Sequence, residues 1–200
     1  MLHRKLILAS ASPRRKELME DIGFPFTIAC AEIEEVLQKD IPVEKAIEQI
    51  ALSKAQNVFL RNPEAIVLGC DTVVCYGKEV LGKPKDKDDA YRMLKMLSGK
   101  THRVISAVAL LQKGHCDVFH DVSEVTFYDL DDDLISYYLS LDEPYDKAGS
   151  YGIQGKGKLL VKELRGDYFS VMGLPVAKVC VALIKNIRNK GFTQPDPTPG

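Results

Sequence analysis

Two long strand-forming segments constrain the fold of this chain more than any other feature of its sequence. They span His102–Leu111 and Asp117–Tyr128, are rich in Val, Leu and Phe, and flank Lys113-Gly114, a pair typical of a hairpin turn. Each segment is longer than the usual strand of about five or six residues. We therefore expect a long antiparallel ribbon that forms part of a larger sheet.

The first part of the chain alternates short apolar runs with helical patterns, which is typical of an α/β protein. Ser12 and Pro13 predict a helix start, with Ser as the N-cap and Pro in the first turn, and Gly23 predicts the end of that helix. The sequence predicts strands over Lys5–Ala9, Phe26–Cys30, Ala65–Leu68, Val73–Tyr76, Glu79–Leu81, Leu159–Leu164 and Phe169–Met172, and further helices over Pro42–Arg61, Asp86–Leu97, Asp131–Leu141 and Val176–Ile187.

These elements predict one α/β domain over residues 1–190, with a mixed, elongated central sheet flanked by helices. Because the long ribbon extends the sheet, we expect two lobes with a cleft between them. Residues 191–200 carry three prolines, which indicates a flexible C-terminal tail.

The charge balance excludes one class of function. The chain has 27 Lys plus Arg against 28 Asp plus Glu, a formal net charge of −1. Sequence-independent nucleic-acid binding needs a basic excess, so we expect no stable nucleic-acid partner. A small anionic ligand is compatible with this balance, because a pocket needs only a few cations, locally placed.

The sequence also indicates a compartment. No stretch reaches the roughly 18 apolar residues of a membrane span, and the apolar run before Ser10 is too short for a signal peptide. The five cysteines are odd in number and scattered, which is typical of reduced, mostly buried thiols. We therefore expect a cytoplasmic protein with no membrane partner.

The sharpest local signal is the segment Ser10-Ala-Ser-Pro-Arg-Arg15, where a strand ends and a helix begins with two arginines. A helix N-terminus attracts anions, so Arg14 and Arg15 have the wrong charge for the helix dipole. Guanidinium groups suit phosphate oxygens, so one interpretation is that an external polyphosphate offsets the two cations. The alternative is two surface arginines behind an ordinary helix cap.

Two lysines supply a second signal. Lys54 lies in the apolar stripe of the helix that begins at Pro42, and a lysine on such a face extends to solvent, pairs with an acid or meets an anion. In Leu81-Gly-Lys83-Pro84, the proline forces Lys83 into an extended conformation and so fixes where this side chain points.

Acidic residues supply a third signal. Asp71 follows directly on an apolar run, and ligand sites of open α/β sheets gather at the carboxyl ends of strands. A carboxylate there can bind Mg²⁺ or orient a water molecule for attack, and the alternative is an Asp that caps a turn. Of the glutamates after Phe26–Cys30, Glu35 can join Asp71 around a metal, whereas for Glu32 and Glu34 we favour a solvated acidic edge.

A glycine-rich loop over Glu143–Gly157 contains one amide side chain, Gln154. Glycines permit close backbone approach, and an amide offers both a donor and an acceptor, so Gln154 can read the edge of a base. The alternative is a merely flexible loop.

These motifs occur together in one family. From Leu6 to about Ile187 the chain resembles the Maf-like nucleoside triphosphate pyrophosphatases. The matching motifs are LASASPRRKEL, IEE at Ile33–Glu35, the SKA around Lys54, GCDTVV, LGKP, LSGKTH, EPYDKAGSYGIQG and GLPV. The combination is specific, whereas no single motif suffices.

The resemblance implies an α/β enzyme, often a homodimer, with a deep nucleotide-binding cleft and a divalent metal, Mg²⁺ or Mn²⁺. It implies a hydrolase acting on acid anhydrides, which splits a nucleoside triphosphate into monophosphate and pyrophosphate. By position, Glu35 and Asp71 match the catalytic carboxylates, which we also expect to hold the metal, and Asp71 matches the proton acceptor. The other matches are the phosphate-contacting lysines Lys54 and Lys83, the phosphate-binding turn Ser10, Arg14 and Arg15, and the positions linked to substrate choice, Arg14, Thr72 and Gln154.

Gln154 also points to a branch of the family. The YGIQG motif looks like that of the dTTP and UTP pyrophosphatases, whereas the branch that handles 7-methyl-GTP typically carries Glu near this place. We therefore expect hydrolysis of dTTP and UTP, with modified pyrimidine nucleotides as further substrates, in a house-cleaning role. The alternative is a nucleotide-binding regulatory protein linked to septum formation in cell division. One departure is Gly82, where related members often carry a larger residue, commonly Glu, before the lysine.

Overall fold

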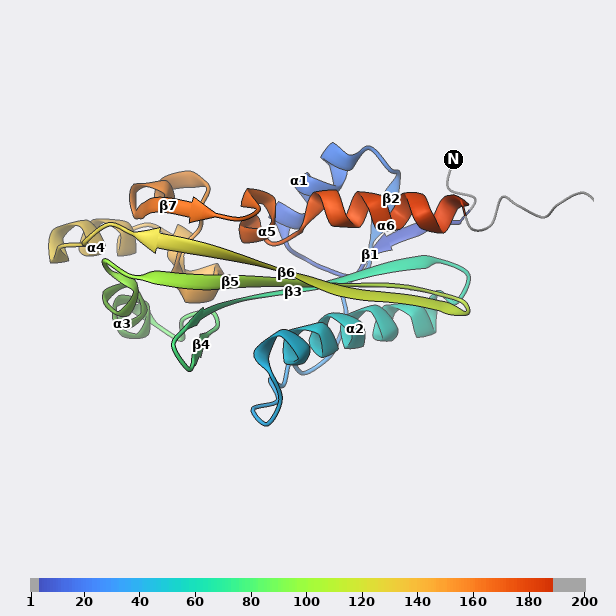
Figure 1. Cartoon of the computed structure of the whole chain (residues 1–200), viewed down its shortest axis with the longest axis horizontal. Coiled ribbons are helices and arrows are strands. Elements are labelled where there is room, and N and C mark those ends of the chain that lie inside the picture. Colours follow the sequence, from blue (N-terminus) through green and yellow to red (C-terminus); the bar gives the residue numbers. More distant parts are fainter. Residues whose placement is uncertain (1–3, 189–200) are drawn as a thin grey trace, which may run out of the picture.

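The computed structural model describes residues 4–188. Its centre is a seven-stranded mixed sheet whose strands follow the order β2-β1-β3-β5-β6-β7, with β4 paired to β3 (Figure 1). β1 pairs in parallel with β2 and β3, and the other pairs are antiparallel. The strands are β1 (Leu6–Leu8), β2 (Phe26–Ile28), β3 (Ile66–Tyr76), β4 (Glu79–Leu81), β5 (Thr101–Gln112), β6 (His115–Phe127) and β7 (Val161–Arg165).

Helices cover both faces of this sheet, which confirms the predicted α/β class. α2 lies on one face, whereas α1 and α6 lie on the other (Figure 1). None of the helices described between residues 4 and 188 combines the length and the hydrophobicity that a membrane span requires. The predicted tail at 191–200 lies outside the described residues. The helices are α1 (Pro13–Ile22), α2 (Val43–Arg61), α3 (Lys87–Leu97), α4 (Asp132–Leu139), α5 (Tyr168–Met172) and α6 (Val176–Arg188), with the short 3₁₀ helices η1 (Glu143–Asp146), η2 (Ala148–Ser150) and η3 (Gly155–Leu159).

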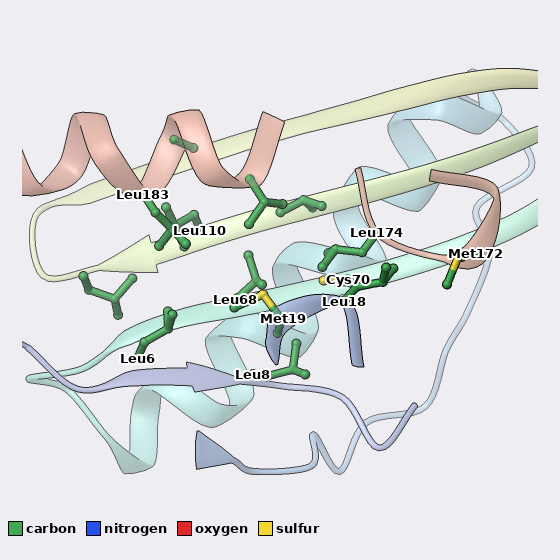
Figure 2. Close-up of a cluster of buried hydrophobic side chains, with 14 of the residues drawn as sticks. Leu6, Leu8, Leu18, Met19, Leu68, Cys70, Leu110, Met172, Leu174 and Leu183 are labelled. Carbon is green, nitrogen blue, oxygen red and sulfur yellow. The ribbon is translucent and has the colours of Figure 1, made fainter. Parts of the chain in front are cut away.

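Alternation along β1 and β3 builds a hydrophobic core on each face. Leu6 and Leu68 point to one core, where they meet Leu183 of α6 (Figure 2). Ile7 and Val67, one residue along each strand, point to the opposite core beneath α2. Both faces of these strands are therefore buried, as expected for the central strands of a sheet covered by helices on both sides.

The predicted long ribbon is confirmed. β5 and β6 pair without interruption from Thr101 opposite Thr126 to Gln112 opposite His115. Gly114 sits in the connecting turn with a φ of 76°, which favours glycine.

One predicted break in the sheet is wrong. β3 is a single strand from Ile66 to Tyr76, and the segment that contains Asp71 lies inside it rather than after it. The strand continues because β5 pairs with it along this whole stretch. Gly69 marks a close approach instead of a turn, since a Cβ there would collide with the carbonyl oxygen of Ala51 in α2.

The predicted strand over Phe169–Met172 is also wrong, because this segment forms helix α5. The side chain of Asp167 accepts a hydrogen bond from the backbone N–H of Phe169 and so caps the helix start. Gly173, with a φ of 124°, ends the helix one turn later. A short apolar run alone does not distinguish a strand from one turn of helix.

The cysteines are less buried than predicted. Cys70 and Cys75 are buried, but Cys30 and Cys116 are exposed, and all five thiols are free. The burial of a cysteine depends on which face of its strand is covered, which the spacing of cysteines alone does not reveal.

His102 is buried in the core that β5 shares with α3 and α4. Its ring is 2% exposed and meets the rings of Phe127 and Tyr151 edge to face, with centroids 4.9 and 5.4 Å away. Its Nε2 lies 2.8 Å from the hydroxyl of Tyr151. Burial lowers the pKa of His102 from 6.5 to about 4, so the fold holds a neutral imidazole at neutral pH.

Stability should therefore depend on pH through His102. Above pH 6.5 the imidazole is neutral in both the folded and the unfolded chain, so its burial costs no stability from protonation. As the pH falls toward 4, the unfolded chain binds a proton that the folded protein binds more weakly, and the free energy of unfolding falls. Between pH 7 and pH 4 we expect the wild-type protein to lose about 3 kcal/mol more free energy of unfolding than His102→Gln. Urea denaturation at each pH measures the difference, and equal pH dependence of the two proteins would contradict the prediction.

Candidate active site

An opening in the sheet positions the site. One edge of β3 pairs with β5 throughout, but on the other edge β1 pairs only with Ile66–Leu68 and β4 only with Val74–Tyr76. In the described part of the chain, residues 69–73 therefore pair with neither strand on that edge. Side chains from both faces of β3 can reach the same space there.

A pocket of about 880 Å³ opens at this edge. All of the site residues predicted from the sequence contribute to its walls, although they come from distant parts of the chain. They are Ser10, Arg14, Arg15, Glu35, Lys54, Asp71, Thr72, Lys83 and Gln154.

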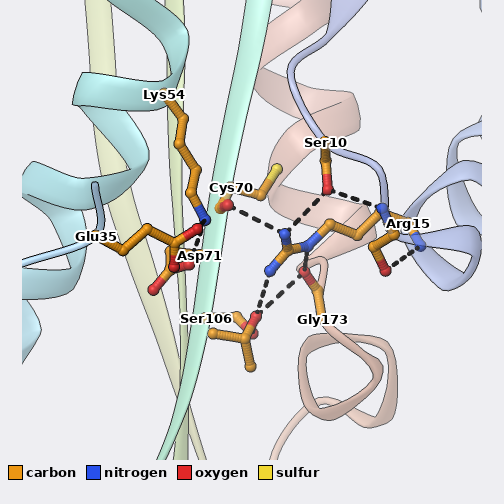
Figure 3. Close-up of polar contacts among 10 residues, drawn as sticks. Ser10, Arg15, Glu35, Lys54, Cys70, Asp71, Ser106 and Gly173 are labelled. Atoms are coloured by element: carbon orange, nitrogen blue, oxygen red, sulfur yellow. Dashed lines mark hydrogen bonds and ion pairs between the residues drawn. The ribbon is translucent and has the colours of Figure 1, made fainter. Parts of the chain in front are cut away.

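The centre of the pocket is an ion-paired group of three residues. Lys54 Nζ of α2 lies 2.7 Å from Asp71 Oδ1 of β3 and 2.8 Å from Glu35 Oε1 in the segment after β2 (Figure 3). The side chains of Lys54 and Asp71 are only 11% and 10% exposed, whereas Glu35 is 53% exposed. Of the alternatives for Lys54, the structure shows pairing with acids, and Asp71 lies within a strand and caps no turn.

The donor set suits a hard divalent cation. Glu35 and Asp71 converge on one positive charge, the ammonium of Lys54, so the two carboxylates already face a common point. Among residues 4–188, no three His, Cys, Asp or Glu side chains come together as metal ligands. Mg²⁺ is nevertheless usually bound by one or two protein carboxylates, with substrate phosphates and water as its other ligands.

Arg15 lies on the opposite side of β3 and is engaged by the protein itself (Figure 3). Its Nη1 donates to Ser10 Oγ at 3.1 Å and to the carbonyl of Cys70 at 3.1 Å. Its Nη2 donates to Thr72 Oγ1 at 3.0 Å, and its Nε donates to the carbonyl of Gly173 at 2.9 Å. These contacts, hereafter the Arg15 clamp, join the β1–α1 turn, β3 and the α5–α6 link.

The clamp uses most of the donors of Arg15. A guanidinium has five N–H groups, so the four contacts leave one, on Nη2, for a ligand. The sequence was interpreted either as a polyphosphate site or as two surface arginines. Neither interpretation predicted that carbonyl and hydroxyl oxygens of the protein surround the guanidinium of Arg15. Arg14 is different, because its side chain makes one long contact, 3.4 Å from Nη1 to Asp146 Oδ2. Arg14 is therefore the arginine with donors to spare.

The hydroxyl of Thr72 belongs to the same network. Ser106 Oγ donates to the carbonyl of Ser170 at 2.6 Å, so in the 2.8 Å contact between the two hydroxyls Thr72 is the donor. Thr72 also accepts from Arg15, so it offers a ligand an acceptor rather than a donor.

Lys83 and Gln154 line the pocket differently. Lys83 is exposed and Gln154 is half-buried, and within residues 4–188 neither side chain has a hydrogen-bond or ion-pair partner. Both are thus available to a molecule in the pocket.

Comparison with known proteins fits this geometry. A family described as Maf-like protein matches residues 5–186. The chain belongs to the Maf family. A protein of Bacillus velezensis named dTTP/UTP pyrophosphatase is 48% identical over 180 residues, which cover 90% of this chain and 95% of that relative. Proteins of Bacillus cereus and Bacillus anthracis with the same name are 48% identical over 176 residues, 88% of this chain and 92% of each relative.

The sequence reasoning missed three charged pocket residues of this Maf chain. Glu143, Asp146 and Lys147 also form its walls, in a loop interpreted only through its glycines and Gln154. Burial raises the pKa of Asp146, but its hydrogen bond with Lys147 and the charge of Arg14 outweigh burial and hold that pKa below its usual value. The cluster of charged residues in the EPYDK segment, residues 143–147, is the sequence signal that could have identified them.

The departure at Gly82 has a simple steric setting. Gly82 lies on the pocket wall, and a Cβ there would meet no atom within 4 Å. A residue with a Cβ therefore meets no steric obstacle at this position.

The Arg15 clamp should matter more for stability than Arg14 does. We expect Arg15→Met to lower the free energy of unfolding by about 3–5 kcal/mol, because it leaves several buried acceptors without a donor. The matched control Arg14→Met, which removes one long contact, should change it by less than about 1 kcal/mol. Urea denaturation of both variants tests this, and similar losses for the two would rule out the clamp.

Proposed function

We propose that this chain is a nucleoside triphosphate pyrophosphatase that hydrolyses dTTP and UTP to the monophosphate and pyrophosphate. The observation that carries the proposal is the buried Lys54–Asp71 pair, with Glu35 beside it, in a pocket that also holds Arg14 and Lys83. The relatives named dTTP/UTP pyrophosphatase, with about half of their residues identical, support the choice of substrate.

The triphosphate would occupy the side of the pocket formed by the β1–α1 turn. Ser12 caps α1, and backbone N–H groups at a helix start favour anions. Arg14 and Lys83 have donors available, and Arg15 keeps one N–H. These cations would stabilise the charge that develops on pyrophosphate as it leaves.

Asp71 would act on the attacking water. Lys54 holds its Oδ1 at 2.7 Å, so Oδ2 is the oxygen that orients the water and accepts its proton. The water oxygen bonds to the α-phosphorus, the bond from that phosphorus to the α–β bridging oxygen breaks, and pyrophosphate departs. A Mg²⁺ or Mn²⁺ ion held by Glu35 and Asp71 would supply charge neutralisation for the phosphates.

Gln154 would select the base. Its amide is both donor and acceptor, which complements the alternating acceptor and donor groups on the edge of uracil or thymine. Thr72 presents an acceptor to the same pocket. Arg14 contacts Asp146, which belongs to the loop that carries Gln154.

The remaining proposals concern the setting of the reaction. We propose the cytoplasm as its compartment, because nucleoside triphosphates are made and used there. We also propose a homodimer, which sedimentation or size-exclusion measurement tests directly.

Asp71→Asn should abolish turnover while the protein still folds and binds nucleotide. The amide keeps the shape but cannot accept the proton, so kcat should fall by at least about 100-fold. Pyrophosphate release with Mg²⁺ measures the loss, and Asp88→Asn, an exposed change on α3, is the control. Full activity of Asp71→Asn would contradict the role of Asp71 as the base. Nucleotide binding by the wild-type protein without release of pyrophosphate would favour the regulatory alternative.

A panel of nucleotides tests the assignment of Gln154. We expect kcat/KM for dTTP and UTP to exceed that for GTP and its derivatives, and Gln154→Ala to reduce this ratio by about tenfold, the effect of one lost polar contact to the base. Preference of the wild-type protein for GTP derivatives would overturn the assignment.

A further inference from the structure

Two residues, Tyr138 and Glu143, hold the backbone on either side of Gln154. The backbone N–H of Gly152 donates to the hydroxyl of Tyr138 at 3.2 Å, and that hydroxyl donates to Glu143 Oε1 at 3.1 Å. After Gln154, the N–H of Lys156 donates to Glu143 Oε2 at 2.9 Å, and that of Gly157 to Oε1 at 3.0 Å.

Two glycines of this segment allow its close packing, and one of them lets the carboxylate of Glu143 approach. Gly155 has a φ of 62°, and a Cβ there would collide with Glu143 Oε2. A Cβ on Gly157 would collide with the carbonyl of Gly152. The glycine-rich loop is therefore tightly packed: Gly155 makes room for Glu143, and Gly157 makes room for the carbonyl of Gly152.

The electrostatics support an ionised Glu143. Burial raises its pKa, but the two backbone N–H groups and the Tyr138 hydroxyl outweigh burial and bring the pKa below its usual value. Tyr138 is 1% exposed on α4, and burial raises its pKa. A buried hydroxyl and a charged acceptor thus fix the backbone on either side of Gln154, whose own side chain is left facing the pocket.

We propose that Glu143 and Tyr138 are positioning residues for Gln154 and thereby determine discrimination between bases. This inference rests on the proposed function. Fixing the backbone at Gly152 and at Lys156-Gly157 limits the directions in which the Gln154 amide can point. The donor and the acceptor of the Gln154 amide are then already oriented for a pyrimidine, whereas a more mobile loop would let the amide bind other bases as well.

The test compares Glu143→Gln with the wild-type protein on dTTP and dATP. The substituted amide keeps one acceptor oxygen but turns an N–H₂ group toward a backbone N–H. We expect the ratio of kcat/KM for dTTP to that for dATP to fall about tenfold, mainly through a higher KM for dTTP, with kcat changed less than about threefold. Glu64→Gln, at a 72% exposed side chain outside the pocket, is the matched control.

A double-mutant cycle separates positioning from general damage. In a Gln154→Ala background, Glu143→Gln should have no further effect on the ratio, because the amide that it positions is gone. Tyr138→Phe removes the hydroxyl alone and should lower the ratio in the same direction, so it carries the test if Glu143→Gln does not fold.

Three outcomes would overturn the inference. An unchanged ratio in Glu143→Gln, with a discriminating wild-type protein, removes the positioning role and leaves the proposed function intact. An additive effect in the Gln154→Ala background does the same. A raised Mg²⁺ requirement with unchanged discrimination would assign Glu143, which lines the pocket, to the metal instead. Absence of pyrophosphate release by the wild-type protein refutes the proposed function itself.

Discussion

The pairing of β3 with β5 continues past the residue where β1 stops and reaches the residue where β4 starts. This leaves a short stretch of β3 whose outer edge has no neighbouring strand among residues 4–188. Buried backbone carbonyls need donors, and at Cys70 the donor is the guanidinium of Arg15. A side chain thus replaces one hydrogen bond of the missing strand, and the space beside it becomes the pocket.

The same stretch of β3 separates two kinds of charge. Asp71 points toward α2, where the ammonium of Lys54 meets it, and Thr72 points the other way, into the Arg15 clamp. The alternation of a strand therefore places an ion-paired carboxylate on one side of β3 and, on the other, a cation held by neutral groups. Arg14 and Lys83 also line the pocket, so a chain with nearly balanced total charge gathers charged side chains of both signs at one place.

Sequence reasoning selected residues that the structure brings to one pocket, but it did not predict their contacts. Local patterns sufficed for α1, because Ser12, Pro13 and Gly23 act within one element. They failed at β3, because Gly69 responds to a helix that precedes it in the chain rather than to a turn. The partners of Arg15 include Gly173, which lies 158 positions away, so no local pattern can reveal that its donors are already engaged. Glu143 was missed for the same reason, since its role depends on how a loop folds around it.

Gly69 has a consequence for the chemistry of the pocket. Its missing side chain lets α2 approach β3 so closely that a Cβ would meet Ala51 and the backbone nitrogen of Ala55, one residue after Lys54. The spacing between this helix and this strand sets how far the ammonium stands from the carboxylate of Asp71. A residue without a side chain therefore helps to set the length of an ion pair that it does not touch, and a larger residue would push the helix and the strand apart.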